Sequence, residues 1–182
     1  MSDKFSFQIE SSDRRRQFPH KVVIGQSDIE TSATVLLKLF AYLLFFRERI
    51  QMGVNLHDDT IPYVPDLVQL DYEMRPVLWV ECGDCPIAKL DRLAVKVPEA
   101  EIWVIARSAE AVAFLVKGMR KAELRQDRYN LLGLDAAMFD EILGLMENRN
   151  RVFWVDGGFD PANVQLDFNG LWFDAAFEVV RF

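Results

Sequence analysis

The sequence predicts an α/β fold in which a mixed β-sheet is flanked by helices. Residues 35–46 are apolar on almost every side, which is typical of a helix buried under a sheet rather than one on the surface. Residues 67–80 contain two strand-forming stretches around Met74-Arg75-Pro76, a pattern typical of a β-hairpin. Further along the chain, helical and strand patterns alternate, and this favours helices packed on a mixed sheet.

The composition indicates one folded unit, and strand patterns near both ends predict extra N- and C-terminal strands. The chain has 182 residues, 51% hydrophobic and 12% aromatic, and no repeat or linker divides residues 1–182. We therefore expect a single domain. The net charge of −7 disfavours broad, non-specific binding of nucleic acid, which depends on Lys and Arg displacing counterions. Any contact with nucleic acid would need a local basic patch.

We expect neither a membrane segment nor a targeting signal. The longest apolar run, residues 39–46, is far shorter than the roughly 20 residues that a membrane-spanning helix needs. The opening MSDKFSFQIE contains neither a basic leader followed by an apolar region nor an arginine-rich pattern. The sequence thus favours a cytoplasmic location.

The first half of the chain is expected to contain two strands and the main helix. Apolar residues alternate in residues 4–10 and cluster in residues 19–25, which predicts the strands. Ser27-Asp28-Ile29-Glu30 matches a capping box, with Ser27 as the N-cap and Glu30 reaching back from the third helical position. This predicts a helix over residues 27–50, followed by a short strand at residues 54–56.

Caps and turn residues mark the elements of the second half. Pro86 opens a helix over residues 86–97, and Ser108 and Asp135 are expected N-caps of two more. Asp156-Gly157-Gly158 predicts the end of a strand, and Asn169-Gly170 predicts a two-residue hairpin turn. The other segments expected after the hairpin are strand 101–106, helix 108–124, strand 129–134, helix 135–146, and strands 151–155, 164–168 and 171–180.

Two carboxylates are expected at one end of the central hairpin. Asp66 precedes the first strand and Glu81 ends the second, so an antiparallel register brings both to the same end. Asp66 alone has the simpler interpretation of a turn residue after a proline. Glu81 follows an apolar strand, where an unpaired carboxylate is costly. Hard cations such as Mg²⁺ bind to one or two carboxylates together with water and phosphate oxygens, so the pair predicts a metal site.

The string Pro65-Asp66, a hairpin and Glu81 resembles the PD-(D/E)xK phosphodiesterase superfamily, which has the restriction-endonuclease-like fold. The family lysine would stand two residues after the glutamate, but that position is Gly83. In relatives whose lysine has moved, it comes from the following helix, and Lys89 is suitably placed for this role.

The chain also resembles the YaeQ family of small bacterial proteins, which has that same fold. The resemblance covers nearly the whole chain and rests on the order and spacing of several strings. These are KFSFQIE, SDIETSATVLLKLFAYLLFF, DDTIPYVPDLVQLD, LWVECG and RVFWVDG. It implies a metal-dependent nuclease site rather than a defined reaction.

An enzyme of the superfamily that the chain resembles would hydrolyse a phosphodiester in DNA or RNA. In that scheme Asp66, Glu81 and the backbone carbonyl of Cys82 would bind Mg²⁺ or Mn²⁺, and Lys89 would orient the attacking water or the phosphate. The family has a first-helix glutamate near the metal, so Glu30 is a further candidate ligand beside its capping role.

The alternative is a catalytically inactive nuclease-fold protein that binds nucleic acid or a protein partner. Lys89, Arg92 and Lys96 share one side of the helix over residues 86–97 and could form the local basic patch. Arg92 and Lys96 also fit the simpler interpretation of a solvated helix face.

A redox protein is the third possibility. Cys82 and Cys85 form a C-x-x-C motif between a strand and a helix, which is how thioredoxin-like proteins hold a reactive thiol. No proline opens a later strand as the thioredoxin pattern requires. The pair is also only half of a structural zinc site.

Overall fold

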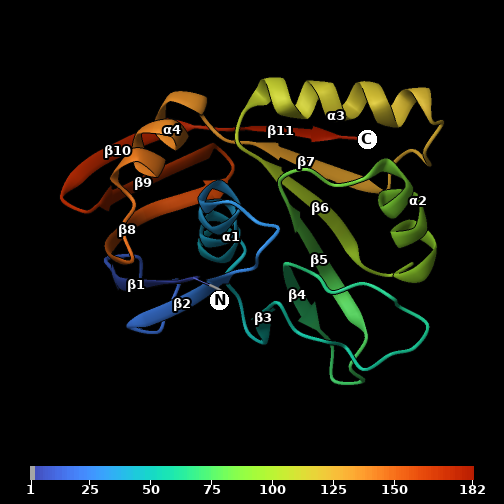
Figure 1. The fold of residues 1–182 in the computed structure, drawn as a ribbon, viewed down its shortest axis with the longest axis horizontal. Helices are drawn as coiled ribbons and strands as arrows, with labels where there is room; N and C mark the ends of the chain where they lie inside the picture. The colour runs from blue at the N-terminus through green and yellow to red at the C-terminus, as the bar shows by residue number, and fades with distance from the viewer. Residues whose placement is uncertain (1–2) are drawn as a thin grey trace.

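The computed structural model describes residues 3–182 and contains two mixed β-sheets and four helices in those residues, which confirms the expected fold class. The strand order is β10-β9-β8-β1-β2 in the five-stranded sheet and β11-β7-β6-β5-β4-β3 in the six-stranded sheet. Figure 1 shows the two sheets on either side of helix α1 (Ser32–Leu44). The sequence patterns therefore predicted the layers, but not the division of the strands between two sheets.

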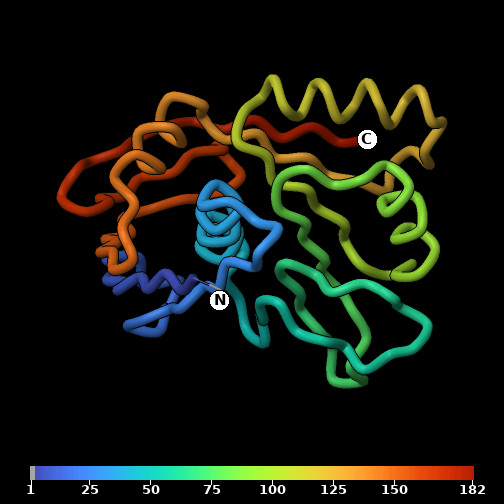
Figure 2. The backbone as a smooth tube through the Cα atoms, in the orientation of Figure 1, coloured from blue at the N-terminus to red at the C-terminus, as the bar shows by residue number. Residues whose placement is uncertain are grey.

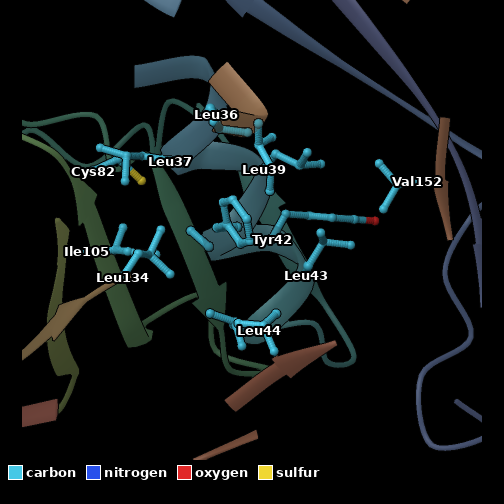
Figure 3. Packing of buried hydrophobic residues seen from close by; sticks show 14 of the residues in the cluster. Leu36, Leu37, Leu39, Tyr42, Leu43, Leu44, Cys82, Ile105, Leu134 and Val152 are labelled. Atoms are coloured by element: carbon cyan, nitrogen blue, oxygen red, sulfur yellow. The ribbon is translucent and has the colours of Figure 1, made fainter. Parts of the chain in front are cut away.

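Helix α1 forms the centre of the molecule. It is buried from Val35 to Leu44, apart from the partly exposed Lys38. Side chains from both sheets surround it: Cys82 and Ile105 come from the six-stranded sheet, and Val152 comes from the other (Figure 3). The expectation of a helix buried under a sheet is confirmed, since α1 has a sheet on each side.

The predicted bounds of this helix were wrong at both ends. Ser27 is not its N-cap: the helix begins after Thr31. The Glu30 carboxylate does accept from the Ser27 N–H (2.9 Å), as in a capping box, but the two residues close an isolated turn. At the other end, α1 stops at Leu44 because the next segment forms strand β3 (Ile50–Met52), which pairs with β4. No strand forms at residues 54–56.

The six-stranded sheet is built around three parallel strands. These are β5 (Pro76–Cys82), β6 (Glu101–Ala106) and β7 (Tyr129–Gly133). Strand β4 (Leu67–Leu70) pairs with β5 in the expected antiparallel hairpin. Helices α2 (Ile87–Lys96) and α3 (Ala109–Lys121) connect the parallel strands and cover the face of the sheet that lies away from α1.

The caps predicted for the later helices are confirmed. The Ser108 hydroxyl accepts from the Ala111 N–H (3.0 Å) at the start of α3, and the Asp135 carboxylate accepts from the Met138 N–H (2.8 Å) at the start of α4 (Ala136–Leu145). The strand at residues 101–106 was predicted with its true bounds. Helix α3 ends three residues before the expected residue 124.

The five-stranded sheet combines the two N-terminal strands with three strands from the last third of the chain. Its strands are β1 (Asp3–Ser11), β2 (Lys21–Gln26), β8 (Arg149–Phe159), β9 (Ala162–Phe168) and β10 (Leu171–Ala176). Asp156-Gly157-Gly158 does not end a strand, because β8 continues through it with a register shift between Trp154 and Asp156. The glycine at 157 is required there, since a Cβ would lie 2.3 Å from the Trp154 ring.

The C-terminal segment joins the two sheets. Asn169 and Gly170 both have positive φ and close the predicted two-residue turn between β9 and β10. The strand expected over residues 171–180 is split, however. Strand β10 pairs with β9, and β11 (Glu178–Arg181) pairs with β7 in the other sheet, so the chain crosses between the sheets (Figure 2). Within residues 3–182, no helix combines the length and the apolar character that a membrane crossing requires.

Candidate functional site

The two predicted acids lie at the same end of the β4–β5 hairpin. Leu67 pairs with Val80, so the next residues outward in this register are Asp66 and Glu81. An Asp66 carboxylate oxygen accepts from the Cys82 N–H at 2.8 Å. The antiparallel register expected from the sequence therefore ties Asp66 directly to the strand end that carries Glu81.

Glu81 is a buried acid with two donors. Its side chain lies on the face of the sheet covered by α2, and only 5% of the residue is exposed. One carboxylate oxygen accepts from the Trp79 indole N–H at 2.7 Å, and the other accepts from the Lys89 ammonium at 2.7 Å. Burial raises the pKa of Glu81 above its ordinary value, although the charge and hydrogen bond of Lys89 act in the opposite direction.

The ammonium of Lys89 reaches Glu81 from the helix that follows the hairpin. Lys89 is the third residue of α2, directs its ammonium back to the hairpin end, and lies 5.5 Å from the centre of the Tyr63 ring. Arg92 and Lys96 are exposed, and Arg92 is hydrogen-bonded to the Tyr63 side chain. The helix face predicted as a basic patch is therefore divided between a site residue and two solvated cations.

Lys38 is a site residue that sequence reasoning missed. Its ammonium pairs with the Glu30 carboxylate and lies 3.6 Å from an oxygen of Asp66. Burial alone would lower the pKa of Lys38, but the hydrogen bond to Glu30 and the charge of Asp66 raise it. The signal was a single lysine in an otherwise apolar, buried helix, because such a charge requires a partner.

Glu30 joins the site through Lys38. Burial raises the pKa of the Glu30 carboxyl, but the Lys38 ammonium and the Ser27 N–H outweigh it, so the pKa is lowered overall. The pKa of Asp66 is raised by burial, against the opposing hydrogen bond from the Cys82 N–H and the charge of Lys38. Glu30, Lys38 and Asp66 together line a hollow of about 530 Å³ on the surface.

The charges of this site do not cancel. The three acids Glu30, Asp66 and Glu81 face two ammonium groups, which leaves one negative charge when all five side chains are ionised. No set of three or more His, Cys, Asp or Glu side chains in residues 3–182 is arranged to hold a metal ion. A cation here would therefore depend on two carboxylates, main-chain carbonyls and water, a ligand set typical of Mg²⁺.

Both cysteines lie in the protein core. Cys82 and Cys85 are both buried free thiols, and they belong to the apolar clusters on opposite faces of the six-stranded sheet. Burial raises the pKa of the Cys82 thiol well above its ordinary value and that of Cys85 to about 12. Reactive thiols have lowered pKa values and are accessible, so both cysteines have the properties of core residues.

Comparisons with known proteins agree with this architecture. The sequence profile of the family described as YaeQ protein matches residues 2–155. The chain belongs to the YaeQ family. This confirms the resemblance inferred from the short sequence strings.

Two solved YaeQ structures share the fold along nearly the whole chain. The YaeQ protein from Xanthomonas axonopodis pv. citri is 22% identical, with a TM-score of 0.72, and the match covers 99% of this chain and 97% of that one. The YaeQ protein from Pseudomonas syringae is 14% identical, with a TM-score of 0.72 and coverage of 100% and 96%. At these identities the likeness establishes the YaeQ fold alone. The search of curated proteins gave no match.

Proposed function

We propose that this YaeQ protein is a metal-dependent phosphodiesterase of the PD-(D/E)xK type. The observation that carries the proposal is the convergence of Asp66 and Glu81 at one hairpin end, with Lys89 supplied by the next helix at 2.7 Å from Glu81. This is the arrangement expected when the family lysine has left the position of Gly83.

The site has the donors and the residual charge for a divalent cation. Asp66, Glu81 and the backbone carbonyl of Cys82 would hold Mg²⁺ or Mn²⁺, and water would complete the shell. Glu30 is a weaker candidate because its carboxylate is already paired with Lys38 and the Ser27 N–H. The raised pKa values of Asp66 and Glu81 reflect buried negative charge, which a cation would stabilise.

The side chains of the chain itself have distinct roles in this scheme. Lys89 fixes one oxygen of Glu81 and has further N–H donors with which to orient a phosphate oxygen or a water. Lys38 bridges Glu30 and Asp66 and offsets part of their negative charge. When bound, the cation would polarise the phosphate and lower the pKa of an attacking water.

A second candidate function has one observation in its favour. Both Asp66 and Glu81 already have a lysine neighbour, so each of these carboxylates has a counter-charge without a cation. A YaeQ protein of this kind would keep the fold and bind nucleic acid or a protein without hydrolysing it.

The decisive experiment is calorimetric titration of Mn²⁺ into the wild type, Glu81→Gln and Lys89→Ala, paired with cleavage assays on DNA and RNA. We expect binding by the wild type, its loss in Glu81→Gln, and its retention in Lys89→Ala with cleavage slower by a factor on the order of 10². Cleavage by Lys89→Ala should be slower because the variant lacks one preorganised charge-stabilising group.

The outcomes separate the two candidates. Metal binding without cleavage of any substrate would favour the binding protein. Equal Mn²⁺ affinity in the wild type and Glu81→Gln would show that the carboxylate is no ligand and would end the metal-site assignment. An exposed acid outside the site, Glu110, provides the control variant Glu110→Gln, which should bind Mn²⁺ like the wild type.

A further inference from the structure

A large groove opens at the end of the six-stranded sheet that carries the candidate site. It has a volume of about 830 Å³ and lies between the start of α1, the loop after β5, and α3. Residues lining it include Leu37, Gly83, Ile87, Arg107, Lys117 and Lys121. This volume is within the range of roughly 300–1,000 Å³ that is typical of ligand sites.

The groove adjoins the hollow that contains Asp66. Leu37 lines the groove and its neighbour Lys38 lines the hollow, so the first turns of α1 form a common wall. Gly83 lines the groove directly after Cys82, whose N–H is bound by Asp66. An extended polymer bound in the groove would therefore reach the candidate site along the protein surface.

The groove is basic, although the protein as a whole is acidic. Arg107, Lys117 and Lys121 line it, against the single acid Asp84. Arg107 is paired with Asp140, whereas Lys117 and Lys121 are exposed and take part in none of the ion pairs found in residues 3–182. Like charges four positions apart on a helix repel each other, so this pair gains from a bound anion.

An exposed aromatic ring stands in line with these lysines. Phe114 is 82% exposed, lines the groove, and lies three and seven positions before Lys117 and Lys121, which places all three on one face of α3. The groove wall is otherwise largely apolar, with Leu37, Ile87 and similar side chains. The cations could pair with phosphates, and the exposed ring on its apolar surroundings could stack with an unstacked base.

We propose that this groove binds a single-stranded polynucleotide, with its phosphates at Lys117 and Lys121 and a base stacked on Phe114. This proposal rests on the proposed function, because the phosphodiesterase site would cleave the bound strand. A duplex fits poorly because its bases are already stacked and its stiffness prevents it from following a short groove. The groove, rather than the Lys89, Arg92 and Lys96 face, is thus the nucleic-acid surface.

The test is fluorescence anisotropy of a labelled oligothymidylate of roughly 12 nucleotides, a length in the range of single-strand binding sites. EDTA in the buffer removes metal-dependent cleavage from the readout. Lys117→Ala combined with Lys121→Ala should weaken binding about tenfold and reduce the slope of log affinity against log salt by about 1.4, since two phosphate contacts are lost. Phe114→Ala should weaken binding on the order of tenfold without changing that slope.

The matched control is Arg120→Ala combined with Arg125→Ala, which removes the same charge from two exposed positions outside the groove, one in the last turn of α3 and one beyond that helix. It should keep wild-type affinity. Equal weakening by the control, equal affinity for a duplex of the same length, or no binding by the wild type would each overturn the proposal.

The same assay with Glu81→Gln separates this proposal from the proposed function. Oligonucleotide binding that persists in Glu81→Gln, while this variant binds Mn²⁺ as tightly as the wild type, would support the groove and remove the phosphodiesterase. Cleavage of a small phosphodiester, bis(p-nitrophenyl) phosphate, without oligonucleotide binding would support the phosphodiesterase and remove the groove.

Discussion

At the scale of single residues, the site is defined by carboxylates that are buried together with their counter-charges. Glu81 is held between the Trp79 indole and the Lys89 ammonium, and Asp66 between the Cys82 N–H and Lys38. Each acid lies where burial raises its pKa. Ionisation of these buried carboxyl groups therefore lowers the free energy of unfolding by an amount that depends on pH.

This cost predicts a specific pH dependence for Glu81. Below its ordinary pKa, Glu81 is protonated in both the folded and the unfolded protein. As the pH rises, the unfolded form releases its proton first, so the folded form holds more protons and its stability falls until the raised pKa is passed. The free energy of unfolding of the wild type minus that of Glu81→Gln should therefore decrease with rising pH and then level off.

Urea denaturation of both proteins from acid to neutral pH measures this difference. A difference that increases with pH would mean that Lys89 and Trp79 lower the pKa of Glu81 more than burial raises it. A difference that is flat over the same interval would mean that burial and the two donors cancel.

At the scale of elements, the capping residues predicted the starts of α3 and α4 correctly, but not the start of α1. Ser108 and Asp135 cap α3 and α4 through their side chains. Ser27 belongs to a sequence of the same type, but its contacts with Glu30 close an isolated turn, and α1 begins five residues later. The Glu30 side chain is directed to Ser27 and Lys38, and the latter contact comes from packing rather than from local sequence.

This contrast gives a paired prediction. Ser108→Ala removes the acceptor of the Ala111 N–H and should lower the free energy of unfolding by about 1 kcal/mol. Ser27→Ala removes a hydroxyl that caps no helix, so the free energy of unfolding should change by less than about 0.5 kcal/mol. Thermal or urea unfolding of the two variants provides the comparison, and equal losses would mean that Ser27 caps α1 after all.

At the scale of the whole molecule, α1 couples the two sheets. Its apolar side chains contact residues of both sheets in one continuous cluster, and β11 connects the C-terminal segment to the six-stranded sheet (Figure 3). We therefore expect residues 3–182 to unfold as one cooperative unit.

Leu36→Ala tests this coupling. Leu36 is fully buried in α1, so the cavity should lower the free energy of unfolding by about 2 to 5 kcal/mol. Hydrogen exchange should show the same loss of protection in β5 and in β8, which belong to different sheets. The control Ile29→Ala shortens a side chain that is 96% exposed and should leave both unchanged. A loss confined to one sheet would contradict the coupling.

The sequence by itself determined the local features of this protein. Residue periodicity and capping residues predicted the buried helix, the strand at 101–106, the later caps and the Asn169-Gly170 turn, because these depend on neighbours within a few positions. The hairpin register also predicted that Asp66 and Glu81 share one end, since a short turn fixes the pairing of its two strands.

Only the tertiary structure decided how distant segments combine. Contacts between segments far apart in the chain separate the strands into two sheets and divide β10 from β11 at residue 177. Such contacts also select the carboxylate partners of Lys38. A strand pattern indicates which face is apolar, but it does not specify the partner strand, because backbone hydrogen bonds are the same for every sequence. A lone buried lysine likewise indicates that a carboxylate must be near, and packing alone selects Glu30 and Asp66.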